Sequence, residues 1–111
     1  MALALLVALV VAAGCADDPA GIPRVEARER ADATADTYSA TVRAHGAELK
    51  FRRLEPANGP DGELWVGTYV LLPPDSSDEA VVCVYITDKD DWAHRTFDDR
   101  CVRDDGTVTV E

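Results

Sequence analysis

Hydrophobic and polar positions along the chain follow two periods, a helical one first and an alternating one after it. Small and apolar side chains recur every three or four residues between Pro23 and Gly46, which predicts a helix with one covered face. Proline suits the first turn of a helix and glycine its end. Residues 37–44 also alternate, so a strand is the alternative there. The predicted face consists of Ala27, Ala31, Thr34, Tyr38, Val42, His45 and Leu49.

After Gly46 the pattern predicts strands. Alternation or β-branched and aromatic residues mark residues 49–52, 63–72, 80–87 and 107–111. Turn-forming residues fill 56–62, and Asp105-Gly106 is a hairpin signal before the last strand. Residues 80–87 are apolar on both faces, which predicts a central strand. In the closing strand, Val108 and Val110 are expected to point inward.

These elements predict one α+β domain, residues 24–111, in which an N-terminal helix packs on an antiparallel sheet of about four strands. The alternative is an all-β small sandwich or barrel. The order of one helix and then a sheet is similar to that of cystatin-like folds, although no motif makes the similarity specific.

The N-terminus carries a different signal. Residues 1–13 contain no polar side chain, and charge first appears at Asp17. The run is too short to span a bilayer, which needs about 20 residues, but it fits the apolar region of a signal peptide. A buried N-terminal helix is the alternative, and it is disfavoured because nothing polar interrupts the run to form a solvent face.

The end of this run, Ala12-Ala13-Gly14-Cys15, resembles the lipobox of bacterial lipoproteins. The sequence departs from that class at Ala12, where Leu is usual, and in lacking a basic residue before the apolar run. The resemblance implies a signal peptide over residues 1–14, removed before Cys15, and a diacylglyceryl lipid, with acyl chains such as palmitate, on its thiol. Residues 15–23 would then form a tether on the extracytoplasmic side of a cell membrane. The alternative is an ordinary secretory signal that leaves a soluble product.

The cysteine count is odd, because the chain has three. Lipidation of Cys15 leaves Cys83 and Cys101 as a pair, and export places them where a disulfide persists. The alternatives are two buried free thiols, or a metal site, which lacks the usual CxxC spacing. We therefore expect a disulfide between Cys83 and Cys101.

Charge is distributed unevenly over a net of −10. Residues 24–55 carry seven basic and six acidic side chains, whereas residues 56–111 carry four and thirteen. Such a field repels phosphate, so we expect no nucleic acid as a partner. A basic protein or a cationic ligand is the expected partner of the acidic half.

The polar segment that begins at Asp88 and ends at Asp105 is the densest source of candidate chemistry, with seven aspartates. It lacks the glycine of a calcium loop at the sixth position, so we interpret it as a solvated loop. Asp90, His94 and Asp98 would share one face if the segment were helical, which makes them weak metal candidates. We expect no cofactor.

Aromatic residues are the other candidates for a site. Trp65 and Tyr69 are expected on one face of a strand, where they form a binding patch if uncovered, or pack under a loop. Trp92 is a further binding candidate. No GxSxG motif or glycine-rich phosphate loop is present. The sequence therefore favours a membrane-tethered, non-enzymatic interaction module. A cation-binding or inhibitor-like domain that uses the Asp-rich segment is the alternative, and a small accessory enzyme is the remaining one.

Overall fold

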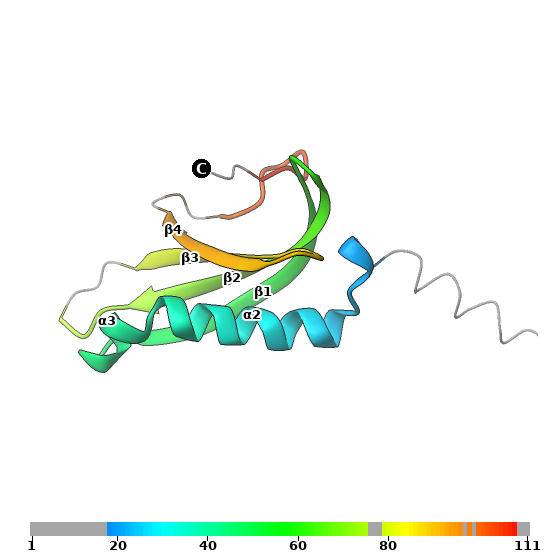
Figure 1. Cartoon of the computed structure of the whole chain (residues 1–111). Helices are drawn as coiled ribbons and strands as arrows, with labels where there is room; N and C mark the ends of the chain where they lie inside the picture. The colour runs from blue at the N-terminus through cyan, green and yellow to red at the C-terminus, as the bar shows by residue number, and fades with distance from the viewer. Residues whose placement is uncertain (1–17, 76–78, 97, 99, 109–111) are drawn as a thin grey trace, which may run out of the picture.

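The computed structural model describes residues 18–75, 79–96, 98 and 100–108. Four strands form an antiparallel sheet in the order β1-β2-β3-β4, and the long helix α2 crosses one face of it (Figure 1). The predicted α+β fold is confirmed, and the all-β alternative is wrong. The elements are η1 (Pro19–Gly21), α2 (Arg24–Tyr38), α3 (Ala40–Ala44), β1 (Glu48–Gly59), β2 (Gly62–Leu72), β3 (Ala80–Ile86) and β4 (Asp91–Thr96).

The fourth strand differs from the predicted one. It is β4, inside the Asp-rich segment expected to be a loop, and it pairs with β3. Its outer position in the sheet tolerates polar side chains, which hid the strand from a search for apolar runs. Thr107, expected to open the last strand, makes only an isolated bridge to Asn58. Val108 is buried as expected, whereas Val110 lies outside the described residues.

The first strand is much longer than predicted. It runs through most of the expected turn cluster, so the connection to β2 is confined to Pro60 and Asp61. An edge strand accepts a proline such as Pro56, because one side of its backbone needs no ladder partner. Beside it, β2 and β3 occupy the centre of the sheet, and the central position expected for residues 80–87 is confirmed.

The predicted helix is divided into two at Ser39. The buried Ser39 hydroxyl donates to the Ala35 carbonyl at 2.6 Å, an arrangement that bends helices. Ala27 and Ala31 are fully buried, as predicted, but the covered face continues through the fully buried Ala35, which the prediction left out. Tyr38 and Val42, expected on that face, are 43% and 36% exposed.

The helix lies close to the sheet because small residues meet at the contact. A Cβ atom at Gly67 of β2 would lie 3.2 Å from the Ala31 Cβ atom and 3.1 Å from the Tyr69 ring. Both distances are shorter than an ordinary van der Waals contact. A larger side chain at Gly67 or Ala31 would therefore push the helix away from the sheet. The core on this side contains Ile22, Ala27, Ala31, Ala35, Leu54, Trp65, Tyr69, Leu71, Val82, Val84 and Ile86.

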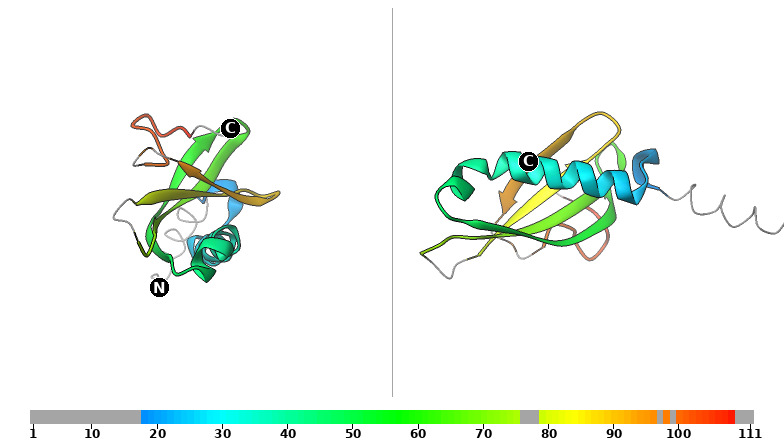
Figure 2. Two further views of the ribbon diagram at one scale, coloured as in Figure 1. Left: turned by 90° about the vertical axis from the view of Figure 1, so that its left-hand side faces the viewer. Right: turned by 90° about the horizontal axis from the view of Figure 1, so that it is seen from below.

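A second core covers the opposite face of the sheet. Residues 100–108 pass over this face in both views of Figure 2, and the predicted disulfide holds them to β3. Cys83 and Cys101 are bonded, with Cα atoms 5.6 Å apart. The core residues here are Ala57, Leu64, Val66, Val81, Cys83, Tyr85, Cys101 and Val108. Closing a loop of 18 residues stabilises a domain by about 3 kcal/mol in the chain-entropy model.

Residues 18–23, predicted to belong to a tether, are part of the domain. Pro19 and Ile22 are buried, and the Trp65 indole N–H donates to the Ile22 carbonyl at 2.8 Å. The apolar side chains of this short segment pack at the end of the core under α2. A tether would have left this end of the core exposed to solvent. The domain therefore begins at Asp18 or earlier. The signal peptide and Cys15 lie outside the described residues.

Substituting Ala31 tests the close contact between the layers. Ala31→Leu inserts a large side chain between α2 and Gly67, and we expect it to lower the free energy of unfolding by about 1–3 kcal/mol. Ala33→Leu makes the same change at an exposed position of the same helix, and should change it by less than about 0.5 kcal/mol. Urea denaturation measures both. Equal effects of the two substitutions would contradict the close contact.

Candidate functional site

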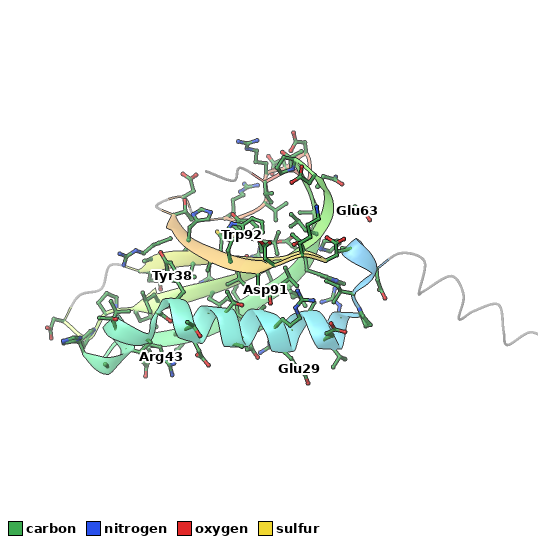
Figure 3. All side chains as sticks on the ribbon, in the orientation of Figure 1. Glu29, Tyr38, Arg43, Glu63, Asp91 and Trp92 are labelled. Atoms are coloured by element: carbon green, nitrogen blue, oxygen red, sulfur yellow. A yellow bond between two sulfur atoms is a disulfide. The ribbon has the colours of Figure 1, made fainter. Side chains whose placement is uncertain are left out.

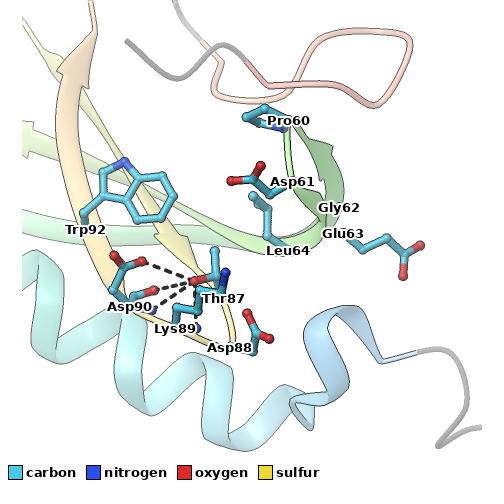
Figure 4. A pocket seen from close by; sticks show the side chains of 10 residues that line it. All are labelled: Pro60, Asp61, Gly62, Glu63, Leu64, Thr87, Asp88, Lys89, Asp90 and Trp92. Carbon is cyan, nitrogen blue, oxygen red and sulfur yellow. Dashed lines mark hydrogen bonds between the residues drawn. The ribbon is translucent and has the colours of Figure 1, made fainter.

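A cleft of about 400 Å³ opens at one end of the sheet, between the β1–β2 hairpin and the β3–β4 loop. We call it the acidic cleft. In Figure 4 the Trp92 indole faces the hairpin across the opening, with Leu64 and Asp61 on the other side. Its volume lies within the range of ligand pockets. The lining residues are Pro60, Asp61, Gly62, Glu63, Leu64, Thr87, Asp88, Lys89, Asp90 and Trp92.

Trp92, which lines the acidic cleft, belongs to an aromatic stack. The Trp92 ring lies 5.2 Å from the Tyr85 ring, and the His94 ring stacks on Tyr85 at 5.4 Å. Burial raises the pKa of Tyr85 to about 12, so its hydroxyl stays protonated, and it shares a hydrogen bond with His94 Nε2 at 2.8 Å. The stack fixes the orientation of Trp92, which is only half-buried and leaves indole surface for a ligand.

Carboxylates surround the opening. The cleft residues carry four acidic side chains, Asp61, Glu63, Asp88 and Asp90, against a single lysine, Lys89. None of the ion pairs found among the described residues includes these four carboxylates. The cleft therefore has a net negative charge that attracts cations.

Internal hydrogen bonds order the β3–β4 loop that forms the floor of the acidic cleft. The Thr87 hydroxyl donates to the Asp90 carbonyl at 2.9 Å. It also accepts from the backbone N–H groups of Lys89, at 3.1 Å, and Asp90, at 3.0 Å. This arrangement is a turn built around one hydroxyl, which is the usual role of threonine in tight connections.

Arg30 of α2 fixes the base of the same loop. Its guanidinium donates to both carboxylate oxygens of Asp91, in one case at 3.0 Å, and to the Thr87 carbonyl at 2.8 Å. The hydrogen bond to Asp91 is the main cause of the raised pKa of Arg30. In Figure 3, Asp91 lies on the side of the sheet that faces α2 and Trp92 lies on the other. Alternation along β4 thus sends one residue to the helix and the next to the cleft.

The structure brings together two of the candidates named from sequence. Asp90 and Trp92 both line the acidic cleft. His94 lies farther along β4 on Tyr85, and Asp98 follows the end of that strand. The metal hypothesis required a helix, and this stretch is a strand instead. In the described part of the chain, no three His, Cys, Asp or Glu side chains converge as a metal site.

Trp65 and Tyr69 share a face, as predicted, but they form no surface patch. They are 4% and 3% exposed and lie under α2. The Tyr69 hydroxyl donates to Asp32 at 2.5 Å, and burial is the main cause of its raised pKa. A helix covers them, rather than the loop considered as the alternative.

Sequence reasoning missed the hairpin half of the acidic cleft. Asp61 and Glu63 stand in the turn cluster and at the start of a strand, where acidic residues are ordinary. Only the folding of the hairpin over the sheet brings them opposite the β3–β4 loop. The excess of acidic residues after residue 56 indicated a negatively charged surface, but it did not show which of these residues form a site.

A second groove, of about 320 Å³, lies at the opposite end of the sheet. It is mainly apolar, and its lining comes from α3 and the connection after it, the ends of β2 and β3, the connection after β2, and β4. The lining residues are Val42, His45, Ala47, Leu71, Pro73, Pro74, Asp75, Ala80 and Arg95.

Comparison with known protein families, curated proteins and solved structures finds no match to this chain. In the described residues, the structure contains no helix that is both long and apolar enough to cross a membrane. The function of the acidic cleft must therefore be inferred from the geometry and charge of the cleft itself.

Removing Arg30 tests how the cleft loop is held. Arg30→Ala leaves the partly buried Asp91 without its charged partner, and we expect a loss of about 1–3 kcal/mol in the free energy of unfolding. Arg43→Ala removes a pair with Asp36 that is largely exposed, and should cost at most about 0.5 kcal/mol. Thermal unfolding of both variants provides the measurement. A loss for Arg30→Ala no larger than that for Arg43→Ala would refute this role.

Proposed function

We propose that the protein is a membrane-tethered interaction module that binds a basic partner through the acidic cleft. The observation that carries this proposal is the combination of a half-buried indole, Trp92, with four acidic residues that line one cleft. An arginine or lysine side chain satisfies both, since a cation is attracted to the face of an indole and to carboxylates.

The size and shape of the acidic cleft favour a side chain over a bare metal ion. Its volume of about 400 Å³ exceeds what a coordinated cation needs. Calcium binds by gathering six to eight oxygens around one point. The carboxylates here stand around a rim, and Glu63 points away from the opening in Figure 4. A planar guanidinium beside Trp92, with carboxylates at its edge, matches this distribution better.

The tether in this proposal comes from the lipobox-like residues that end at Cys15. The Cys83–Cys101 disulfide independently supports export, because disulfides persist in oxidising compartments outside the cytoplasm. A tethered module with an open, negatively charged cleft has the properties of a capture surface, in which charge guides encounter and the cleft provides selectivity.

Binding of a basic peptide tests the role of the acidic cleft. A tetraarginine peptide should bind the wild-type domain and change Trp92 fluorescence, and added salt should weaken it. Asp61→Asn combined with Asp88→Asn should weaken binding about tenfold, or roughly 1.4 kcal/mol.

The control for this experiment changes the same net charge elsewhere. Glu48→Gln combined with Asp75→Asn removes two carboxylates at the other end of the sheet, and should change affinity by less than about twofold. If both double variants weaken binding equally, overall charge attracts the peptide and the cleft has no special role.

Mass spectrometry of the membrane fraction tests the tether. Wild-type protein should carry a diacylglyceryl group on an N-terminal Cys15, because the thiolate accepts the lipid. Cys15→Ser should lack that mass and should not be processed in the same way. A wild-type product released without lipid would instead indicate an ordinary secretory signal.

A further inference from the structure

We propose that residues 18–23 form a short rigid stem that holds the acidic cleft at the membrane surface, so that its basic partner is presented from that same membrane. The inference rests on the proposed function, which supplies the lipid on Cys15 and the cationic ligand. It adds an orientation for the domain and a location for the partner.

The stem is fixed to the sheet by several contacts. Pro19 and Ile22 are buried, and the Trp65 indole N–H holds the Ile22 carbonyl. Within the stem, Gly21 N–H donates to the Asp18 carbonyl and Ile22 N–H to the Pro19 carbonyl, both at 3.0 Å. A segment held in this way does not act as a flexible linker from Asp18 onward.

Very little chain remains between the stem and the lipid. Only Ala16 and Asp17 separate Cys15 from Asp18. Three Cα–Cα steps of about 3.8 Å limit the distance from Cys15 to Asp18 to about 11 Å. A diacylglyceryl group on Cys15 therefore keeps the stem within about that distance of the headgroup layer.

The acidic cleft lies at the same end of the sheet as the stem. Trp65, which binds the stem, directly follows the cleft residue Leu64 and pairs with Ile86 at the start of the cleft loop. The stem, the β3–β4 loop and the curled part of the hairpin all lie at the right-hand end of Figure 1. The residues after β2 lie at the other end, about 34 Å away along an eleven-residue strand.

Electrostatics then select the partner. The Debye length at physiological salt is about 8 Å, which is comparable to the maximum distance between Cys15 and Asp18. An acidic cleft held so close to anionic phospholipids is repelled by them, and a basic segment between the two neutralises both surfaces. A basic segment at the headgroup layer therefore gains contacts with the membrane and the cleft together, which a freely diffusing partner does not.

Paramagnetic relaxation in nanodiscs tests the orientation. The lipidated protein, which begins at Cys15, is inserted into nanodiscs whose headgroups carry a nitroxide. We expect the amide signals of Glu63 and Lys89 to relax roughly fivefold or more faster than those of Gly46 and Asp75, given the ~34 Å between the two ends. An eight-residue Gly-Ser insertion between Asp17 and Asp18 should remove most of this difference.

Peptide binding on the same nanodiscs tests the partner. A tetraarginine peptide with its own lipid chain should bind the wild type more tightly than the insertion variant by about tenfold, whereas free tetraarginine should bind both equally. Equal relaxation at both ends, or no effect of the insertion on the lipidated peptide, would overturn the inference. Loss of all peptide binding, or a Cys15 without lipid, would instead contradict the proposed function.

Discussion

The close approach of α2 to the sheet is the constraint on which the rest of the domain depends. Ala31 and Gly67 meet where a larger residue would not fit. The helix therefore lies close enough to the sheet for its longer side chains to reach the strands and the loops between them. Arg30 can therefore reach the β3–β4 loop, and Asp32 can reach the Tyr69 hydroxyl. If the helix lay farther from the sheet, both sets of hydrogen bonds would be lost, and Arg30 would no longer hold the β3–β4 loop.

Much of the fold could be predicted from the sequence because β2, β3 and the disulfide have strong local signals. The helix face was predicted correctly as far as Ala31 and misplaced after it, because alanine is a weak marker of burial and Ala35 carried no more signal than Thr34. The fourth strand was missed because an edge strand needs little apolar surface, so Asp91 and Arg95 concealed it. Such errors arise where tertiary packing, rather than local pattern, decides which residues are covered.

The site was less accessible from the sequence than the fold. Trp92 and Asp90 were candidates, but for unrelated reasons and among others that the structure places elsewhere. Trp65 and Tyr69 had the same sequence character as Trp92 and became core residues, because α2 covers their face. The cleft itself arises from two turns that are remote in sequence, so no motif in either turn could reveal it.

The stem also determines how the domain responds to mechanical load. Tension on the N-terminus enters through the contact with Trp65 on β2, an inner strand, so it does not peel an edge of the sheet. The stem contacts lie in series before α2, so this tension reaches them before it reaches α2. Six detached residues span at most about 20 Å when fully extended, and their release leaves the pairing of the four strands intact. Pulling on the N-terminus therefore loads the stem before it loads the hydrogen bonds between the strands.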